Sequence, residues 1–201
     1  MPELIYSKLA EVIETSSTGF TAQCYDLNAA PALGSLVKTS LDGMTVYAVV
    51  AYVSTTSLEP GRKPVARGKD IETEEAIFQA NPQLEKLLRC EVAAIIVGHQ
   101  LDGEVKHYLP PRPARLHGFV HACDDAEVRA FSQKTGFISL LLAAQTDVSA
   151  EEMTAAVIRR MSASYEGDGR RQFLVTAGKA LAQLLSADYN RLKSILERLA
   201  A

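Results

Sequence analysis

The sequence predicts an α+β protein in which a small six-stranded antiparallel β-barrel, residues 1–115, is followed by a helical region, residues 116–201. Two observations support this prediction. Short runs with strand-like alternation fill the first part of the chain, whereas apolar residues recur with a helical period after the proline-rich stretch 110–113. With 201 residues, 47% of them hydrophobic, the chain is long enough to bury a core.

Short β-strands account for most of the first part of the chain. The Asp-Gly pairs 42–43 and 102–103 readily supply the two positive φ values of a type I′ turn, so each predicts a tight hairpin. The six strand-like runs are residues 9–14, 19–25, 33–39 and 44–53 and the two halves of the hairpin at 91–108.

The run at residues 44–53 is apolar on both faces, because hydrophobic side chains occupy odd and even positions alike. A strand buried on both sides is typical of a barrel wall that other elements cover from outside. The two faces are Val46, Ala48 and Val50 on one side and Tyr47, Val49, Ala51 and Val53 on the other.

A helical insertion near residues 73–88 interrupts the strands. Thr73 is a predicted N-cap, and Asn81-Pro82 separates a first helix from a second, shorter one. A basic loop precedes these helices, and its cations are Arg62, Lys63, Arg67 and Lys69. We interpret the loop either as a contact site for phosphates or an acidic partner, or as a solvated connection.

Helical periodicity dominates the chain after residue 116. Ser149 and Glu152 form a predicted capping box, and Asp124 with Glu127 forms a second capping pattern. The last apolar stripe consists of Leu192, Ile195, Leu196 and Leu199. A short helix is stable in water only when such a stripe is covered, so we expect the stripe to pack within the chain or to form an oligomer interface.

His117, His121 and Cys123 form the one cluster that resembles a transition-metal site. Two histidines four residues apart share one face of a helix, and a nearby thiolate is a suitable third ligand. Pro113 and Gly118, however, favour irregular or extended backbone, in which these side chains do not converge in that way. We therefore interpret the cluster as a structural junction, keep zinc binding as the alternative, and predict no cofactor.

The sequence lacks the common signatures of nucleotide binding and nucleophilic catalysis. The string 175–180 has neither the first glycine nor the hydroxyl residue of a phosphate-binding loop. No Gly-x-Ser-x-Gly elbow is present, and Cys24 and Cys90 stand where small buried hydrophobes are usual. We therefore predict no catalytic residue.

Charge and composition limit the classes of binding partner and the cellular compartment that the sequence favours. A net charge of −3 provides no global basic field that would draw the chain to nucleic acid or to an anionic membrane. The charge-free apolar run 43–58 is shorter than a spanning helix of about 20 residues, and residues 1–8 lack the pattern of a signal peptide. Three cysteines without Cys-x-x-Cys spacing indicate reduced thiols, so we expect a cytoplasmic protein with no membrane contact.

Several segments of the first part resemble the HAS-barrel domain, the six-stranded barrel at the N-termini of HerA-type hexameric DNA-translocating ATPases and of ATP synthase catalytic subunits. The similar segments are residues 9–15, 20–22 and 33–37 and the Asp-Gly pair 42–43 followed by the apolar run 46–50. The resemblance implies an assembly or docking module, because the barrel of those machines holds subunits together and carries no chemistry.

These observations lead to three hypotheses for the function. The first is a non-catalytic assembly or docking module, an adaptor or oligomerisation partner for a hexameric ATPase, which implies a protein partner or a homo-oligomer. The alternative is a nucleic-acid-binding barrel that uses the basic loop 62–69. The third is an uncharacterised enzyme.

Overall fold

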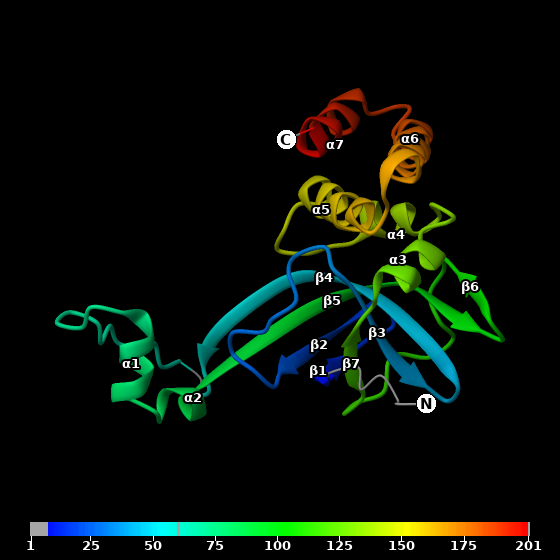
Figure 1. Ribbon diagram of the computed structural model, residues 1–201. Coiled ribbons are helices and arrows are strands. Elements are labelled where there is room, and N and C mark those ends of the chain that lie inside the picture. The colour runs from blue at the N-terminus through cyan, green and yellow to red at the C-terminus, as the bar shows by residue number, and fades with distance from the viewer. Residues whose placement is uncertain (1–7, 60, 201) are drawn as a thin grey trace.

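A closed six-stranded antiparallel β-barrel forms the base of the molecule, and helices are stacked on one side of it (Figure 1). This architecture confirms the α+β fold predicted from the sequence. The structure is a computed structural model that describes residues 8–59 and 61–200. The start of the chain, for which no signal peptide is predicted, and Pro60 of the basic loop lie outside the described residues.

Hydrogen-bonded pairing closes the sheet into a ring. The strands follow the order β2-β1-β7-β3-β4-β5, and an additional pairing between β2 and β5 joins the two ends. A short strand, β6, pairs with β5 alone and stands outside the ring. The strands are β1 (Lys8–Thr15), β2 (Gly19–Cys24), β3 (Leu36–Leu41), β4 (Met44–Ser57), β5 (Leu88–Leu101), β6 (Glu104–Lys106) and β7 (Phe119–Ala122).

The sixth barrel strand is not the one that the sequence predicts. The second half of the hairpin at 91–108 forms β6, whereas β7 lies between β1 and β3 and completes the wall. The barrel therefore extends past the predicted boundary at residue 115. β7 escaped prediction because it has four residues and buries only one side chain, Val120, which is too short a pattern to detect.

Both Asp-Gly hairpins form as predicted. Asp42 and Gly43 have φ values of 46° and 79°, and Asp102 and Gly103 have values of 51° and 80°. The third strand begins at Leu36 instead of residue 33, since the preceding residues form a turn that approaches a helix.

Two hydrophobic clusters lie on opposite sides of the barrel wall. Val46, Ala48 and Val50 of β4 belong to the cluster inside the barrel. Residues on the other face of β4, among them Val49, pack in a second cluster together with the helices. This confirms the prediction of a wall covered from outside. Val53 joins the inner cluster instead of the outer one, because the register shift between Val50 and Tyr52 reverses the alternation.

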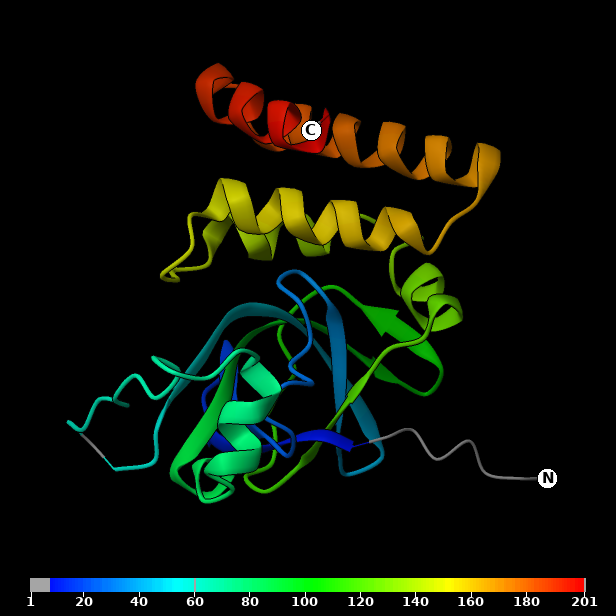
Figure 2. The same cartoon turned by 60° about the vertical axis from the view of Figure 1, so that its left-hand side comes forward.

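The helices after the barrel form two layers (Figure 2). α4 and α5 lie on the barrel, and α6 and α7 lie on top of them. Both predicted N-caps are observed, and Asp124 and Glu127 form the full reciprocal capping box. At Ser149 only half of the predicted box forms: its hydroxyl accepts a hydrogen bond from the Glu152 amide, while the Glu152 carboxylate pairs with Arg159 and Arg198. The helices are α3 (Asp125–Phe131), α4 (Phe137–Ala143), α5 (Ala150–Ala163), α6 (Gly167–Leu184) and α7 (Tyr189–Ala200).

The predicted insertion contains α1 (Glu74–Ala80) and α2 (Leu84–Leu87). Thr73 caps α1, as predicted, by accepting a hydrogen bond from the Ala76 amide at 3.3 Å. None of the described helices combines the length and the apolar character that a membrane crossing requires.

Candidate functional site

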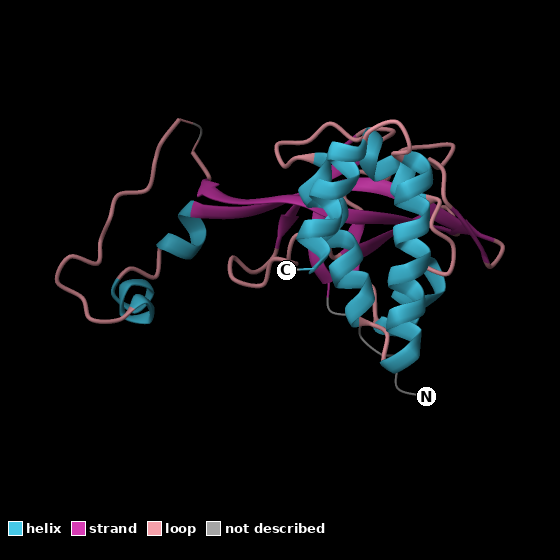
Figure 3. Ribbon diagram, turned by 90° about the horizontal axis from the view of Figure 1, so that it is seen from above, coloured by secondary structure: helices cyan, strands magenta, loops and turns pink. Residues whose placement is uncertain are grey.

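Strands β4 and β5 continue together beyond the barrel as a two-stranded ribbon. Residues 44–49 of β4 also pair with β3, and residues 91–95 of β5 also pair with β2. In the described part of the chain, residues 55–57 and 88–90 pair only with each other. This ribbon carries α1 and α2 away from the barrel and from the helical layers (Figures 1 and 3). We call the ribbon end and the insertion 58–87 the arm.

The insertion 58–87 has no buried core. Every described residue from 58 to 89 retains solvent exposure, and neither α1 nor α2 buries a side chain. Apolar groups are nevertheless present: Val65 is 78% exposed, Leu58 is 47% exposed and Leu87 is 42% exposed. Isolated helices shorter than about 12 residues are marginal in water, so α1 and α2 depend on contacts with other elements.

A few polar contacts hold the arm in its conformation. The Leu58 amide donates to the Leu87 carbonyl at 2.8 Å and closes the insertion at its base. Arg67 reaches across the arm and donates to the Asn81 side-chain oxygen at 3.0 Å. Arg62 forms an exposed salt bridge with Glu59 at 2.8 Å. These contacts partly enclose a small cavity of about 80 Å³ beside the basic loop.

Between residues 62 and 75, the charges of the arm are separated into two consecutive blocks. The basic block consists of the predicted loop residues Arg62, Lys63, Arg67 and Lys69. The acidic block consists of Asp70, Glu72, Glu74 and Glu75, and the last two of these lie in the first turn of α1. Within the described residues, no salt bridge joins the two blocks. Arg62 pairs with Glu59 and Arg67 with Asn81, whereas Lys63, Lys69 and the described acidic block form no salt bridge and remain open to a charged partner.

The predicted stripe in α7 packs mainly inside the chain. Ile195 is fully buried, and Leu192 and Leu199 pack against the helical cluster, so only Leu196 retains large exposure, at 43%. Two ion pairs fasten α7 to α5: Arg198 lies 3.0 Å from Glu152, and Arg191 lies 2.5 Å from Glu151. Of the two expectations for this stripe, the structure shows packing within the chain.

The predicted His117, His121 and Cys123 cluster is dispersed. His117 lies in a turn at a φ of 62°, and its Nδ1 is 2.7 Å from Glu11. Hydrogen bonds from His117 and then from Tyr25 lower the pKa of Glu11 below its ordinary value. His121 lies in β7, in the extended backbone that the sequence favours. The described residues contain no group of three or more His, Cys, Asp or Glu side chains that could hold a metal ion.

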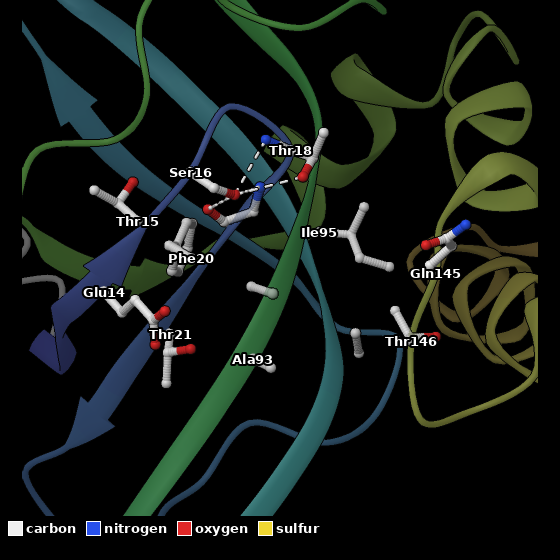
Figure 4. Close-up of a pocket in the computed structure, with 13 residues that line it drawn as sticks. Glu14, Thr15, Ser16, Thr18, Phe20, Thr21, Ala93, Ile95, Gln145 and Thr146 are labelled. Atoms are coloured by element: carbon white, nitrogen blue, oxygen red, sulfur yellow. Dashed lines mark hydrogen bonds between the residues drawn. The ribbon is translucent and has the colours of Figure 1, made fainter.

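Figure 4 shows a cavity of about 240 Å³ on the barrel. It lies between the β1–β2 turn and Gln145 and Thr146 of the loop that follows α4. Its lining is mostly hydroxyl and apolar, and Glu14 is its one ionisable residue. An acid–base pair needs two titratable groups with different pKa values, which this lining does not supply.

The cysteine thiols are poor nucleophiles in the folded chain. Cys24 and Cys90 are buried inside the barrel. Burial, followed by the neighbouring Cys90 thiol, raises the pKa of Cys24 to about 12. Burial likewise raises the pKa of Cys123 well above its ordinary value. The thiolate is the reactive form of cysteine, so these environments suppress its chemistry.

This suppression gives a direct prediction for thiol labelling. At pH 8, native protein is expected to react with a disulfide reagent such as DTNB at least about 100-fold more slowly than unfolded protein, because Cys24 and Cys90 are buried and burial raises the pKa of Cys24 and of Cys123. Absorbance of the released chromophore measures both rates, and unfolding in guanidinium should expose all three thiols. Rapid labelling of one thiol in the native state would contradict the conclusion that burial suppresses the reactivity of the cysteines.

A comparison with protein-family models finds no match to this chain, and a search of curated proteins finds no similar sequence. The interpretation of the arm therefore rests on the structure of this chain and not on a similar protein. The sequence predicts the basic loop but not its projection from the barrel, because the polar end of β4, residues 54–57, has no alternating apolar residues and resembles a turn. The signal that was available is the high β-propensity of its two threonines, Thr55 and Thr56.

Proposed function

We propose that this protein is a non-catalytic assembly and docking module and that the arm is its contact element. One observation carries the proposal: an ordered insertion of thirty residues, 58–87, projects from the barrel without burying any of its described side chains. Apolar side chains and short helices that lack a core gain stability when another protein covers them.

The resemblance to the HAS-barrel supports the same function. Such barrels hold subunits together in hexameric ATPases, so we propose a hexameric ATPase as the machine with which this module assembles. A cytoplasmic location is part of the proposal and is supported by the three free cysteines.

The nucleic-acid alternative receives less support from the arm. Its basic block is followed directly by four acidic residues, which repel phosphates.

Deletion of the arm tests the proposal. Ser57 and Leu88 are the last paired residues of the ribbon, so an Asn-Gly turn can replace residues 58–87 directly. We expect the shortened chain to keep its circular dichroism spectrum and to lose no more than about 1 kcal/mol of unfolding free energy, because no buried side chain is removed.

Affinity purification with the full-length and shortened chains as baits then measures the function. Recovery of an ATPase subunit with the full-length bait, and its loss with the shortened bait, is the expected result. Equal recovery with both baits would exclude the arm as the contact element. Recovery that disappears on nuclease treatment would favour the nucleic-acid alternative instead.

A further inference from the structure

We infer that a second copy of this chain covers the arm, in a two-fold dimer that pairs the basic block of each copy with the acidic block of the other. This inference rests on the proposed function, because it names the occupant of the same surface. The pair, and not the single chain, would then be the unit that assembles with a larger machine.

The order of charges along the arm supports this choice of partner. A two-fold interface brings the same patch of both subunits together, so a patch carrying one sign of charge repels its own copy. The arm instead carries four basic residues followed by four acidic ones. A two-fold axis between residues 69 and 70 places opposite blocks against each other twice, and the arm is then complementary to itself.

The lack of pairing within one copy supports the same conclusion. Glu59 forms an ion pair with Arg62, yet the described acidic block forms no ion pair with any basic residue of its own chain. The first turn of α1, with Glu74 and Glu75, also leaves these carboxylates at the surface. Their most complementary partner on this protein is the basic block of another copy.

The size and the apolar content of the arm fit a dimer interface. A specific interface of standard size contributes about 20–30 residues from each side, and the insertion contains thirty. Val65, Leu58 and Leu87 supply exposed apolar surface next to the charged blocks. Such an arrangement, with apolar contacts beside complementary charges, is typical of specific protein interfaces.

Complementary charge reversal tests the inference with purified protein. The first variant replaces the basic block by acids (Arg62→Glu, Lys63→Glu, Arg67→Glu and Lys69→Glu). The second variant replaces the acidic block by bases (Asp70→Lys, Glu72→Lys, Glu74→Lys and Glu75→Lys). Sedimentation velocity of the wild type should show a dimer, with a dissociation constant that rises with salt. Either variant alone should dimerise about 100-fold more weakly or not at all, whereas an equimolar mixture of the two should form a heterodimer.

A matched control distinguishes the effect of the charged blocks on the arm from the effect of the total net charge of the chain. Reversal of four exposed basic residues elsewhere (Lys134→Glu, Arg170→Glu, Arg171→Glu and Lys179→Glu) changes the net charge by the same amount as the first variant. This control is expected to dimerise like the wild type apart from weak general repulsion. When the control is mixed with the second variant, it should not restore heterodimer formation as the first variant does. Circular dichroism confirms that each variant is folded.

Two results would overturn the inference. One is a wild-type chain that remains monomeric up to about 100 μM in low salt. The other is a dimer that neither block reversal weakens, which would place the interface elsewhere. Both results leave the proposed function open to its own test, because arm-dependent recovery of an ATPase subunit would then show that the arm binds the ATPase directly.

Discussion

Replacement of Gly34 by alanine is expected to destabilise the protein by about 2–4 kcal/mol, because this residue lies where the barrel touches the helical layer. Gly34 has a φ of 80°, and its amide donates to the Val50 carbonyl at 2.8 Å. A Cβ atom at this position would stand 2.7 Å from the carbonyl carbon of Ala156 and 2.8 Å from the amide nitrogen of Val157, both in the backbone of α5. Helix backbone cannot yield as a flexible side chain does, so α5 must shift.

Gly43 provides a matched control for this substitution. Its φ of 79° is nearly the same, but no atom lies within 4 Å of the position of its Cβ. Gly43→Ala should therefore cost only the backbone strain, about 1 kcal/mol. Urea unfolding monitored by circular dichroism measures both values. Equal losses at the two positions would show that the turn before β3 is not tightly packed on α5.

Replacement of Phe131 by alanine has the second large expected effect, a loss of about 3–5 kcal/mol in unfolding free energy. Phe131 of α3 is fully buried and lies at the centre of an aromatic cluster. Its ring centroid is 4.7 Å from that of His107, 5.0 Å from that of Tyr47 and 5.6 Å from that of Phe137. These contacts join β4, the segment after β6, and α4, so the cavity left by truncation cannot close by movement of one element alone.

Phe119 of β7 offers the comparison for this truncation. It is 42% exposed, and the Lys8 ammonium lies over its ring at 3.6 Å from the centroid. Phe119→Ala removes the same side chain from a half-solvated site and should cost about 1 kcal/mol. Guanidinium unfolding of the two variants distinguishes the sites. If Phe131→Ala lowered the unfolding free energy no more than Phe119→Ala does, the aromatic cluster would not hold β4, the segment after β6, and α4 together.

The features that the sequence predicts correctly are those that depend on neighbouring residues. Asp-Gly pairs require positive φ values wherever they form a two-residue hairpin turn, so both hairpins are specified locally. Thr73, Asp124 and Ser149 cap helices through hydrogen bonds that span three residues. Apolar residues on both faces of β4 predicted a covered barrel wall, because alternation within one strand reveals how many of its sides are buried.

Which strands pair and which helices pack together is seen only in the tertiary structure. β7 completes the barrel and β6 does not, since closure depends on pairing with β3, about 85 residues away in the chain, and with β1, about 110 residues away. The stripe around Ile195 is covered because α5 lies beneath it, which no periodicity in α7 could reveal. The basic loop was visible in the sequence, but its position at the end of an arm follows from the long-range register of β4 with β5. Local sequence patterns specify turns and helix caps. Closure of the barrel, burial of the α7 stripe and projection of the arm depend instead on contacts between residues that are distant in the chain.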